Sequence, residues 1–202
     1  MRTAGIVLCG GGSNRMGRPK AWLPFGNELM LPRVVRILAG VVSPVVVVAA
    51  PGQDLPPLPA SVEVVRDRAE GRGPLEGLGS GLESLCNRAD AAYLSACDAP
   101  FLRPEFIRRM IALIGDNWIC APRIGGFHEP LAAVYRLDVR ETVQRLLHEN
   151  RFGPMGLFES APTRSVDPSE LSDVDPTLES LRNVNSREDY EAALRDLAAA
   201  VE

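Results

Sequence analysis

A glycine-rich stretch near the N-terminus carries the residue types that bind phosphate groups. Residues 8–20 read LCGGGSNRMGRPK and follow an apolar run that predicts a buried strand. Glycines allow the backbone to approach a ligand closely, and successive backbone N–H groups can form an anion-binding concavity. Arg15 would supply a forked donor for phosphate oxygens, and Lys20 a point charge. The stretch therefore predicts a polyphosphate-binding loop after a first strand, with an ordinary glycine-rich turn as the alternative.

Two common nucleotide-binding loops do not fit this stretch. The P-loop requires Lys-Ser/Thr after its second glycine, whereas Arg18 and Pro19 follow Gly17. The dinucleotide-binding fingerprint requires a third glycine at the position where Arg15 stands. The pattern that remains is Leu-x-Gly-Gly-x-x-x-Arg-Met-Gly-x-x-Lys.

The elements that would position this loop alternate between strands and helices over residues 1–115. Residues 45–49 form a continuous run of four valines and an alanine, which is typical of a strand buried on both faces. The apolar residues of segment 30–39 have helical spacing. This alternation predicts an α/β fold, Rossmann-like and doubly wound, with a mostly parallel sheet and helices on both faces. We predict further strands near 4–9, 62–65, 91–96, 118–121 and 131–135. Further helices are expected at 75–85, from 104, at 139–147, at 153–159 and from 186, with Asp138 and Ser186 as N-caps of the helices that follow them. Residues 165–179 are expected to form an exposed loop.

Two acidic residues stand at the ends of predicted strands. Asp67 follows the strand at 62–65, and Asp98 follows the strand at 91–96. Ligands of open α/β sheets bind outside the carboxyl ends of the strands. A carboxylate at this place suits Mg²⁺, which prefers carboxylate and phosphate oxygens. Asp98 is therefore a candidate metal ligand, with a turn or helix-cap aspartate as the alternative.

Composition excludes several classes of protein. The net charge is −4, which argues against a nucleic-acid-binding protein. The longest apolar run is too short to span a bilayer, and we see no signal peptide, so we expect no membrane association. Lys20 is the only lysine in the chain. The cysteines, Cys9, Cys86, Cys97 and Cys120, are too far apart in sequence for a zinc site; a reducing cytoplasm is the expected location.

Five motifs together resemble those of the molybdenum cofactor guanylyltransferases, a family of nucleotidyltransferases with a Rossmann-like fold. They are spread from residue 8 to residue 189, so the resemblance covers nearly the whole chain. Beside the glycine-rich loop they are Gly-Pro-Leu-Glu-Gly at 73–77 with Asp67 before it, Cys-Asp-Ala-Pro-Phe at 97–101, Glu-Pro-Leu-Ala-Ala-Val-Tyr at 129–135, and Asn-Val-Asn at 183–185.

The resemblance implies a reaction and a set of site residues. The terminal phosphate of molybdenum-bound molybdopterin would attack the α-phosphorus of GTP, forming the guanine dinucleotide and releasing pyrophosphate, with Mg²⁺ as cofactor. It implies one nucleotidyltransferase domain over 1–202, with a nucleotide-binding half at 1–115 and an acceptor-substrate half at 116–202. Carrier proteins and molybdoenzyme chaperones are the partners it suggests. The implied catalytic residues are Arg15, Lys20 and Asp98, with Asp98 on the metal; the nucleotide-binding residues are Leu8, Cys9, Gly10, Gly11, Gly12, Ser13, Lys20, Asp67, Gly73, Gly77 and Asp98; the acceptor residues are Asn183 and Asn185.

Departures from the family pattern leave alternatives open. Cys9 stands where alanine is usual, and Ala49-Ala50-Pro51 stands where some members have a nucleotide-contacting asparagine. Base choice is thus the open point, and molybdopterin cytidylyl transfer is one alternative. The others are a sugar-phosphate nucleotidyltransferase and a non-catalytic nucleotide-binding protein. His128 lies beside a family motif and could contact substrate, whereas His148 is expected at the surface.

Overall fold

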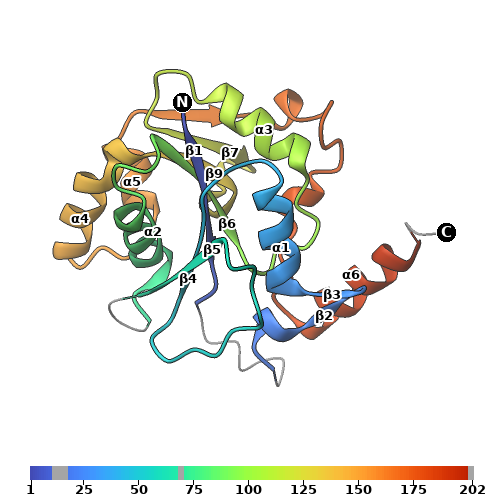
Figure 1. The fold of residues 1–202 in the computed structure, drawn as a ribbon. Helices are drawn as coiled ribbons and strands as arrows, with labels where there is room; N and C mark the ends of the chain where they lie inside the picture. The colour runs from blue at the N-terminus through green and yellow to red at the C-terminus, as the bar shows by residue number, and fades with distance from the viewer. Residues whose placement is uncertain (11–17, 68–70, 200–202) are drawn as a thin grey trace.

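A twisted eight-stranded sheet forms the centre of the protein (Figure 1). The computed structural model describes residues 1–10, 18–67 and 71–199. The strand order is β10-β7-β9-β6-β1-β4-β5, with β8 paired to β7. The pairs β6–β9, β7–β9 and β7–β8 are antiparallel, and the other pairs of this sheet are parallel. The strands are β1 (Thr3–Leu8), β4 (Val45–Ala49), β5 (Val62–Arg66), β6 (Ala91–Ala96), β7 (Ile119–Ile124), β8 (Phe127–His128), β9 (Ala133–Arg136) and β10 (Thr163–Val166).

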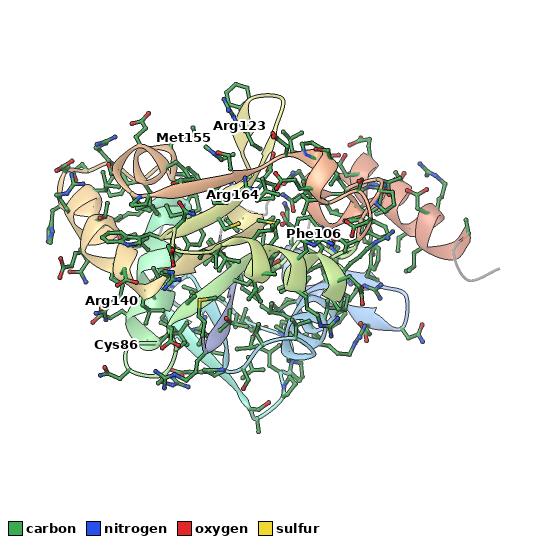
Figure 2. All side chains as sticks on the ribbon, turned by 90° about the horizontal axis from the view of Figure 1, so that it is seen from above. Cys86, Phe106, Arg123, Arg140, Met155 and Arg164 are labelled. Atoms are coloured by element: carbon green, nitrogen blue, oxygen red, sulfur yellow. The ribbon has the colours of Figure 1, made fainter. Side chains whose placement is uncertain are left out.

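Helices cover both faces of the sheet because the central strands are apolar on both sides. In β1, Val7 packs into one core cluster with α1 and α3, while its neighbour Ile6 packs into a second cluster with α2, α4 and α5. Successive side chains of a strand point to opposite faces, so each strand feeds both cores. In Figure 2, Phe106 of α3 and Arg140 of α4 mark these two opposite sides. The helices are α1 (Met30–Ala39), α2 (Gly73–Ser84), α3 (Pro104–Leu113), α4 (Arg140–His148) and α5 (Met155–Ser160).

A third, smaller cluster joins the C-terminal helix to the N-terminal half. A two-stranded hairpin, β2 (Pro24–Phe25) and β3 (Glu28–Leu29), lies beside α6 (Arg187–Ala199) (Figure 1). Phe25 is fully buried there, in one cluster with residues of α6. The Tyr190 hydroxyl of α6 also donates a hydrogen bond to the backbone oxygen of Pro24. The C-terminal helix is thus held against the hairpin that follows β1 in sequence.

The structure confirms the predicted fold class and corrects several elements. The doubly wound, mostly parallel sheet and the helix at 30–39 are as predicted. The prediction of an exposed loop over 165–179 was wrong in part, because this segment contains the end of β10 and the buried side chain of Asp175. Asp138 does not cap α4: it lies in a 3-10 turn, and the N-cap position belongs to Val139. The predicted strand at 131–135 begins as a 3-10 turn, since β9 starts at residue 133; the 3-10 turns are Lys20–Trp22, Pro130–Ala132, Leu137–Val139, Pro168–Glu170 and Glu179–Leu181.

No helix in the described part of the chain has both the length and the apolar character that crossing a membrane requires.

Candidate functional site

The candidate site lies at the carboxyl edge of the parallel strands. Three hydrogen bonds extend the strand pairing past the last strand residues. Cys9 N donates to Val48 O at 2.7 Å, and Cys97 N donates to Leu8 O at 2.9 Å. Asp67 N donates to Ala49 O at 2.9 Å. The residues that follow β1, β5 and β6 therefore start from one shared edge, as the sequence predicted for the glycine-rich loop, Asp67 and Asp98.

Lys20, Asp98 and Asn185 meet at this edge. The Lys20 ammonium donates to Asp98 Oδ2 at 2.5 Å and to Asn185 Oδ1 at 2.9 Å. The Lys20 side chain is 20% exposed and the Asp98 side chain 13%, so the ion pair is largely shielded from water. Shielding strengthens the attraction between opposite charges relative to a surface pair. The structure thus brings two predicted catalytic residues and one predicted acceptor residue into direct contact.

The segment that carries Asn185 is fixed to the same edge by its backbone. Val184 N donates to the backbone oxygen of Asp98 at 2.9 Å. Asp189 Oδ2 accepts from the backbone N–H groups of Asn185 and Ser186, at 3.0 and 2.9 Å. Ser186 Oγ accepts from Asp189 N at 3.0 Å, which confirms Ser186 as a capping residue of α6. These backbone hydrogen bonds lower the pKa of Asp189, because they stabilise its charged form.

Asp67 is a half-buried carboxylate whose surroundings disfavour its charged form. Its Oδ1 atom is buried and has no hydrogen-bond partner among the described residues. Burial raises the pKa of Asp67, and the charge of Glu76 raises it further, while the nearby Ser80 hydroxyl acts in the opposite direction. A buried acceptor without a partner is costly, so a ligand that donates hydrogen bonds would be favoured here.

Glycine stands at three positions of the predicted site for different structural reasons. A Cβ on Gly10 would lie 3.7 Å from Asp67 Oδ2, so the start of the loop runs close to this carboxylate. Gly73 has φ +75°, and a Cβ there would lie 3.2 Å from the backbone oxygen of Phe152. A Cβ on Gly77 would lie 3.0 Å from Leu8, so this glycine lets α2 pack on β1. Glycine at 77 thus has a packing reason, and its contact with nucleotide stays a prediction.

Four predicted site residues lie outside the described residues: Gly11, Gly12, Ser13 and Arg15. Leu8 is half-buried, and Cys9 is buried beside Cys97, the residue that follows β6. The hydrogen bond with Cys9, followed by burial, raises the pKa of the Cys97 thiol well above its usual value. A thiol held neutral in this way is a poor nucleophile, so we assign Cys97 to packing. The contact of Cys9 with the nucleotide stays a prediction.

In the acceptor half, His128 lies on β8 in a hairpin that projects from the body of the protein (Figure 2, beside Arg123). Its Nε2 atom lies 2.8 Å from Ser165 Oγ, and its ring stacks on Phe158 at 4.5 Å. Burial lowers the pKa of His128, and the charge of Arg123 lowers it further. His148 ends α4 at the surface, as predicted. Asn183 is half-buried, two residues before Asn185.

Two polar residues at this edge were not predicted. The Gln53 amide donates to Cys9 Sγ at 3.6 Å, and its oxygen accepts from Ala50 N at 3.0 Å. Gln53 lies in the loop after β4, where some family members have a nucleotide-contacting asparagine that this sequence lacks. The absence of that asparagine was the sequence signal that another polar residue could stand in this loop. Glu76 is only 4% exposed at the start of α2. An acidic residue inside the motif Gly-Pro-Leu-Glu-Gly was the signal for a second carboxylate near Asp67.

The donor set at this edge suits Mg²⁺ together with a polyphosphate. The described residues contain no cluster of three or more His, Cys, Asp or Glu side chains that could hold a metal ion. Mg²⁺ needs no such cluster, since it is usually bound by one or two carboxylates and by substrate phosphates. Asp98 Oδ2 already faces a cation, the Lys20 ammonium. A single hard oxygen donor at the edge where the predicted phosphate-binding loop begins would therefore fit this metal.

Comparison with known proteins identifies the family of the chain. The family profile described as MobA-like NTP transferase domain matches residues 5–163. The chain belongs to this family. A relative from Mycobacterium avium, named probable molybdenum cofactor guanylyltransferase, is 37% identical over 205 residues, which cover 99% of this chain and 97% of the relative.

Solved structures share the fold of this MobA-like NTP transferase. Molybdopterin-guanine dinucleotide biosynthesis protein A from Archaeoglobus fulgidus superposes with a TM-score of 0.80 at 18% identity, covering 97% of this chain and 99% of the other. A Mycobacterium tuberculosis protein solved in complex with manganese superposes with a TM-score of 0.67 at 18% identity, covering 96% and 99%. At these identities the likeness establishes the fold, and the site must be argued from this chain's own residues.

Proposed function

We propose that this nucleotidyltransferase transfers GMP from GTP to the terminal phosphate of molybdenum-bound molybdopterin, releasing pyrophosphate and forming the molybdopterin guanine dinucleotide. The observation that carries the proposal is the meeting of Lys20, Asp98 and Asn185 at one edge of the sheet. The name of the M. avium relative supports the choice of acceptor and nucleotide. The raised pKa of Asp67, and its buried oxygen that lacks a partner among the described residues, support guanine, whose N–H groups can donate to a carboxylate.

Such a transfer needs alignment and charge neutralisation more than an acid, a base or a protein nucleophile. The nucleotide-binding residues hold the triphosphate against the strand ends, and Lys20 and Arg15 offset the charge that develops on the phosphates. Asp67 orients the base. The acceptor segment with Asn183 and Asn185 lies next to Lys20, so the attacking phosphate enters from the acceptor half at 116–202.

Asp98 would hold Mg²⁺, with the nucleotide phosphates completing its coordination. When bound, the ion supplies charge stabilisation and orientation of the phosphate oxygens. The manganese complex of the M. tuberculosis neighbour is in line with a divalent metal in proteins of this fold. Transfer from a carrier protein and to a chaperone, in the cytoplasm, completes the proposal for partners and location.

The direct test is incubation of the protein with Mg²⁺, molybdopterin and GTP, CTP or ATP, followed by separation of the dinucleotide products. We expect product with GTP alone. Product from CTP alone would identify a cytidylyltransferase, and no product from any nucleotide would contradict the proposal.

The roles of the site residues are tested in the same assay. We expect Lys20→Ala and Asp98→Ala each to lower kcat by much more than tenfold, a change of ~1.4 kcal/mol in the barrier. Asp116→Asn is the control, since Asp116 is exposed outside the site. A loss of less than about tenfold for either alanine variant would refute the assigned roles.

A further inference from the structure

Asn185 contacts the nucleotide half of the site through its side chain. Its Oδ1 atom accepts a hydrogen bond from Lys20 Nζ at 2.9 Å, across 165 positions of sequence. The same ammonium donates to Asp98 Oδ2 at 2.5 Å. We propose that Asn185 is a positioning residue that holds the Lys20 ammonium beside Asp98, at the place where it meets the nucleotide triphosphate. The inference rests on the proposed function in treating Lys20 as a phosphate-binding cation.

A lysine at this site needs to be positioned. Its side chain is long and flexible, and it loses rotamer freedom when it binds a phosphate. An ion pair with Asp98 fixes the distance of the ammonium from one carboxylate oxygen but leaves its direction free. A second acceptor on another element fixes that direction before the nucleotide arrives. Preorganisation of this kind lowers the entropic cost of binding.

The framework around Asn185 is rigid enough for this role. Val184 N is hydrogen-bonded to the backbone oxygen of Asp98, so Asp98 and Asn185, which both accept from the ammonium, belong to directly connected segments. Asp189 accepts from Asn185 N, which ties this residue to the first turn of α6. The contact between Tyr190 and Pro24 then ties α6 to the hairpin that follows Lys20.

The residue type also fits. The amide oxygen of asparagine accepts a hydrogen bond without adding charge. A carboxylate at position 185 would add a negative charge beside Asp98 and would repel the phosphates. An apolar residue would leave Lys20 with one acceptor fewer. Asparagine thus orients the lysine while leaving its positive charge available to the nucleotide.

The test is a double-mutant cycle in nucleotide binding, without molybdopterin. Isothermal titration with GTP and with GMP, both with Mg²⁺, is performed on the wild type, Asn185→Ala, Lys20→Ala and the double variant. We expect Asn185→Ala to raise the Kd of GTP about fivefold and that of GMP less than twofold, since GMP lacks the β- and γ-phosphates. In the Lys20→Ala background, the Asn185 substitution should have no further effect, because the residue it positions is gone.

Two further variants keep the result interpretable. Glu188→Gln is the matched control, since Glu188 is exposed in the first turn of α6, three residues after Asn185, and the GTP affinity of this variant should stay within twofold of the wild type. Asp189→Ala loosens the backbone of Asn185 without changing its side chain. It should weaken GTP binding less than Asn185→Ala does, and only when Lys20 is present. This variant also provides the test if Asn185→Ala fails to fold.

The inference is overturned if the effects of Lys20→Ala and Asn185→Ala multiply, because Asn185 would then act independently of Lys20. It is also overturned if Asn185→Ala weakens GMP as much as GTP, or changes neither. Failure of the proposed function has a different signature. In that case Lys20→Ala would leave GTP binding unchanged, or the cycle would show coupling between Asn185 and Lys20 in GTP binding while the protein forms no dinucleotide.

Discussion

Replacement of Asp67 by asparagine should stabilise the protein and impair nucleotide binding at the same time. Asp67 Oδ1 is buried and has no hydrogen-bond partner among the described residues, with Glu76 adding a like charge nearby. An unsatisfied buried acceptor costs about 1–3 kcal/mol. Asparagine keeps a polar group at this position but removes the buried negative charge and its repulsion from Glu76. Because the carboxyl group as a whole is only half-buried, we expect a gain of ~1 kcal/mol for Asp67→Asn, at the lower end of that range. For a chain of this size this corresponds to a rise of about 2–4 °C in Tm.

The gain should depend on pH in a defined direction. The folded-state pKa of Asp67 is raised above the ordinary value of 3.8. The folded state therefore binds this proton more firmly than the unfolded state, and wild-type stability falls as the pH rises from 3.8 through the raised pKa. The advantage of Asp67→Asn should be fully present above that raised pKa and should disappear below 3.8, where the aspartate is neutral in both states.

Thermal unfolding of the wild type, Asp67→Asn and the exposed control Asp116→Asn at pH 4 and pH 8 measures this difference. Titration with GTP and ITP supplies the functional half, since ITP lacks the 2-amino donor of guanine. We expect the variant to bind GTP at least tenfold more weakly and to lose the preference for GTP over ITP. An Asp67→Asn protein that is less stable than the wild type at pH 8, or equally stabilised at both pH values, would refute the reasoning.

Two further predictions concern the elements that position the site. Gly5→Ala should destabilise the protein by about 1–3 kcal/mol in urea unfolding, because the new Cβ would lie 2.5 Å from the fully buried Leu38. Gly153→Ala, which meets nothing within 4 Å, is the control and should change stability by less than about 0.5 kcal/mol; equal effects would contradict the packing argument. Ser186→Ala should cost about 1 kcal/mol, since it removes the hydroxyl that accepts from Asp189 N at the start of α6. An unchanged urea midpoint would show that Ser186 does not stabilise the helix.

The elements that the sequence predicted best are those with strong local patterns. The valine run of β4 is buried at every position, and the helical spacing of α1 gave its bounds correctly. The strand β10 was missed because it is a short edge strand between Pro162 and Pro168, with Arg164 and Ser165 in its middle. Its pairing with β7 is a tertiary contact, which cannot be predicted from four residues that carry no clear apolar pattern.

The features of the candidate site also differ in how far the sequence could predict them. The places of Asp67 and Asp98 follow from a topological rule, since parallel strands end at one edge, and these residues stand one and two positions after such strands. The partnership of Lys20 with Asn185 follows from no local pattern. It requires α6 to pack against the hairpin at the other end of the chain, and that packing depends on contacts such as the hydrogen bond from Tyr190 to Pro24.

These contacts change how the two halves of the chain should be viewed. The division at residue 115 stays a prediction, but the Lys20–Asp98 pair of the first half contacts the second half through Val184 N, which donates to the Asp98 backbone oxygen, and through Asn185 Oδ1, which accepts from the ammonium. A nucleotide site built only from residues 1–115 would lose both. On the proposed function, the C-terminal segment would therefore serve the nucleotide half as well as the acceptor half. Because the same ammonium contacts both halves, docking of the acceptor segment and alignment of the triphosphate should be energetically coupled, and Lys20 is the residue through which that coupling would pass.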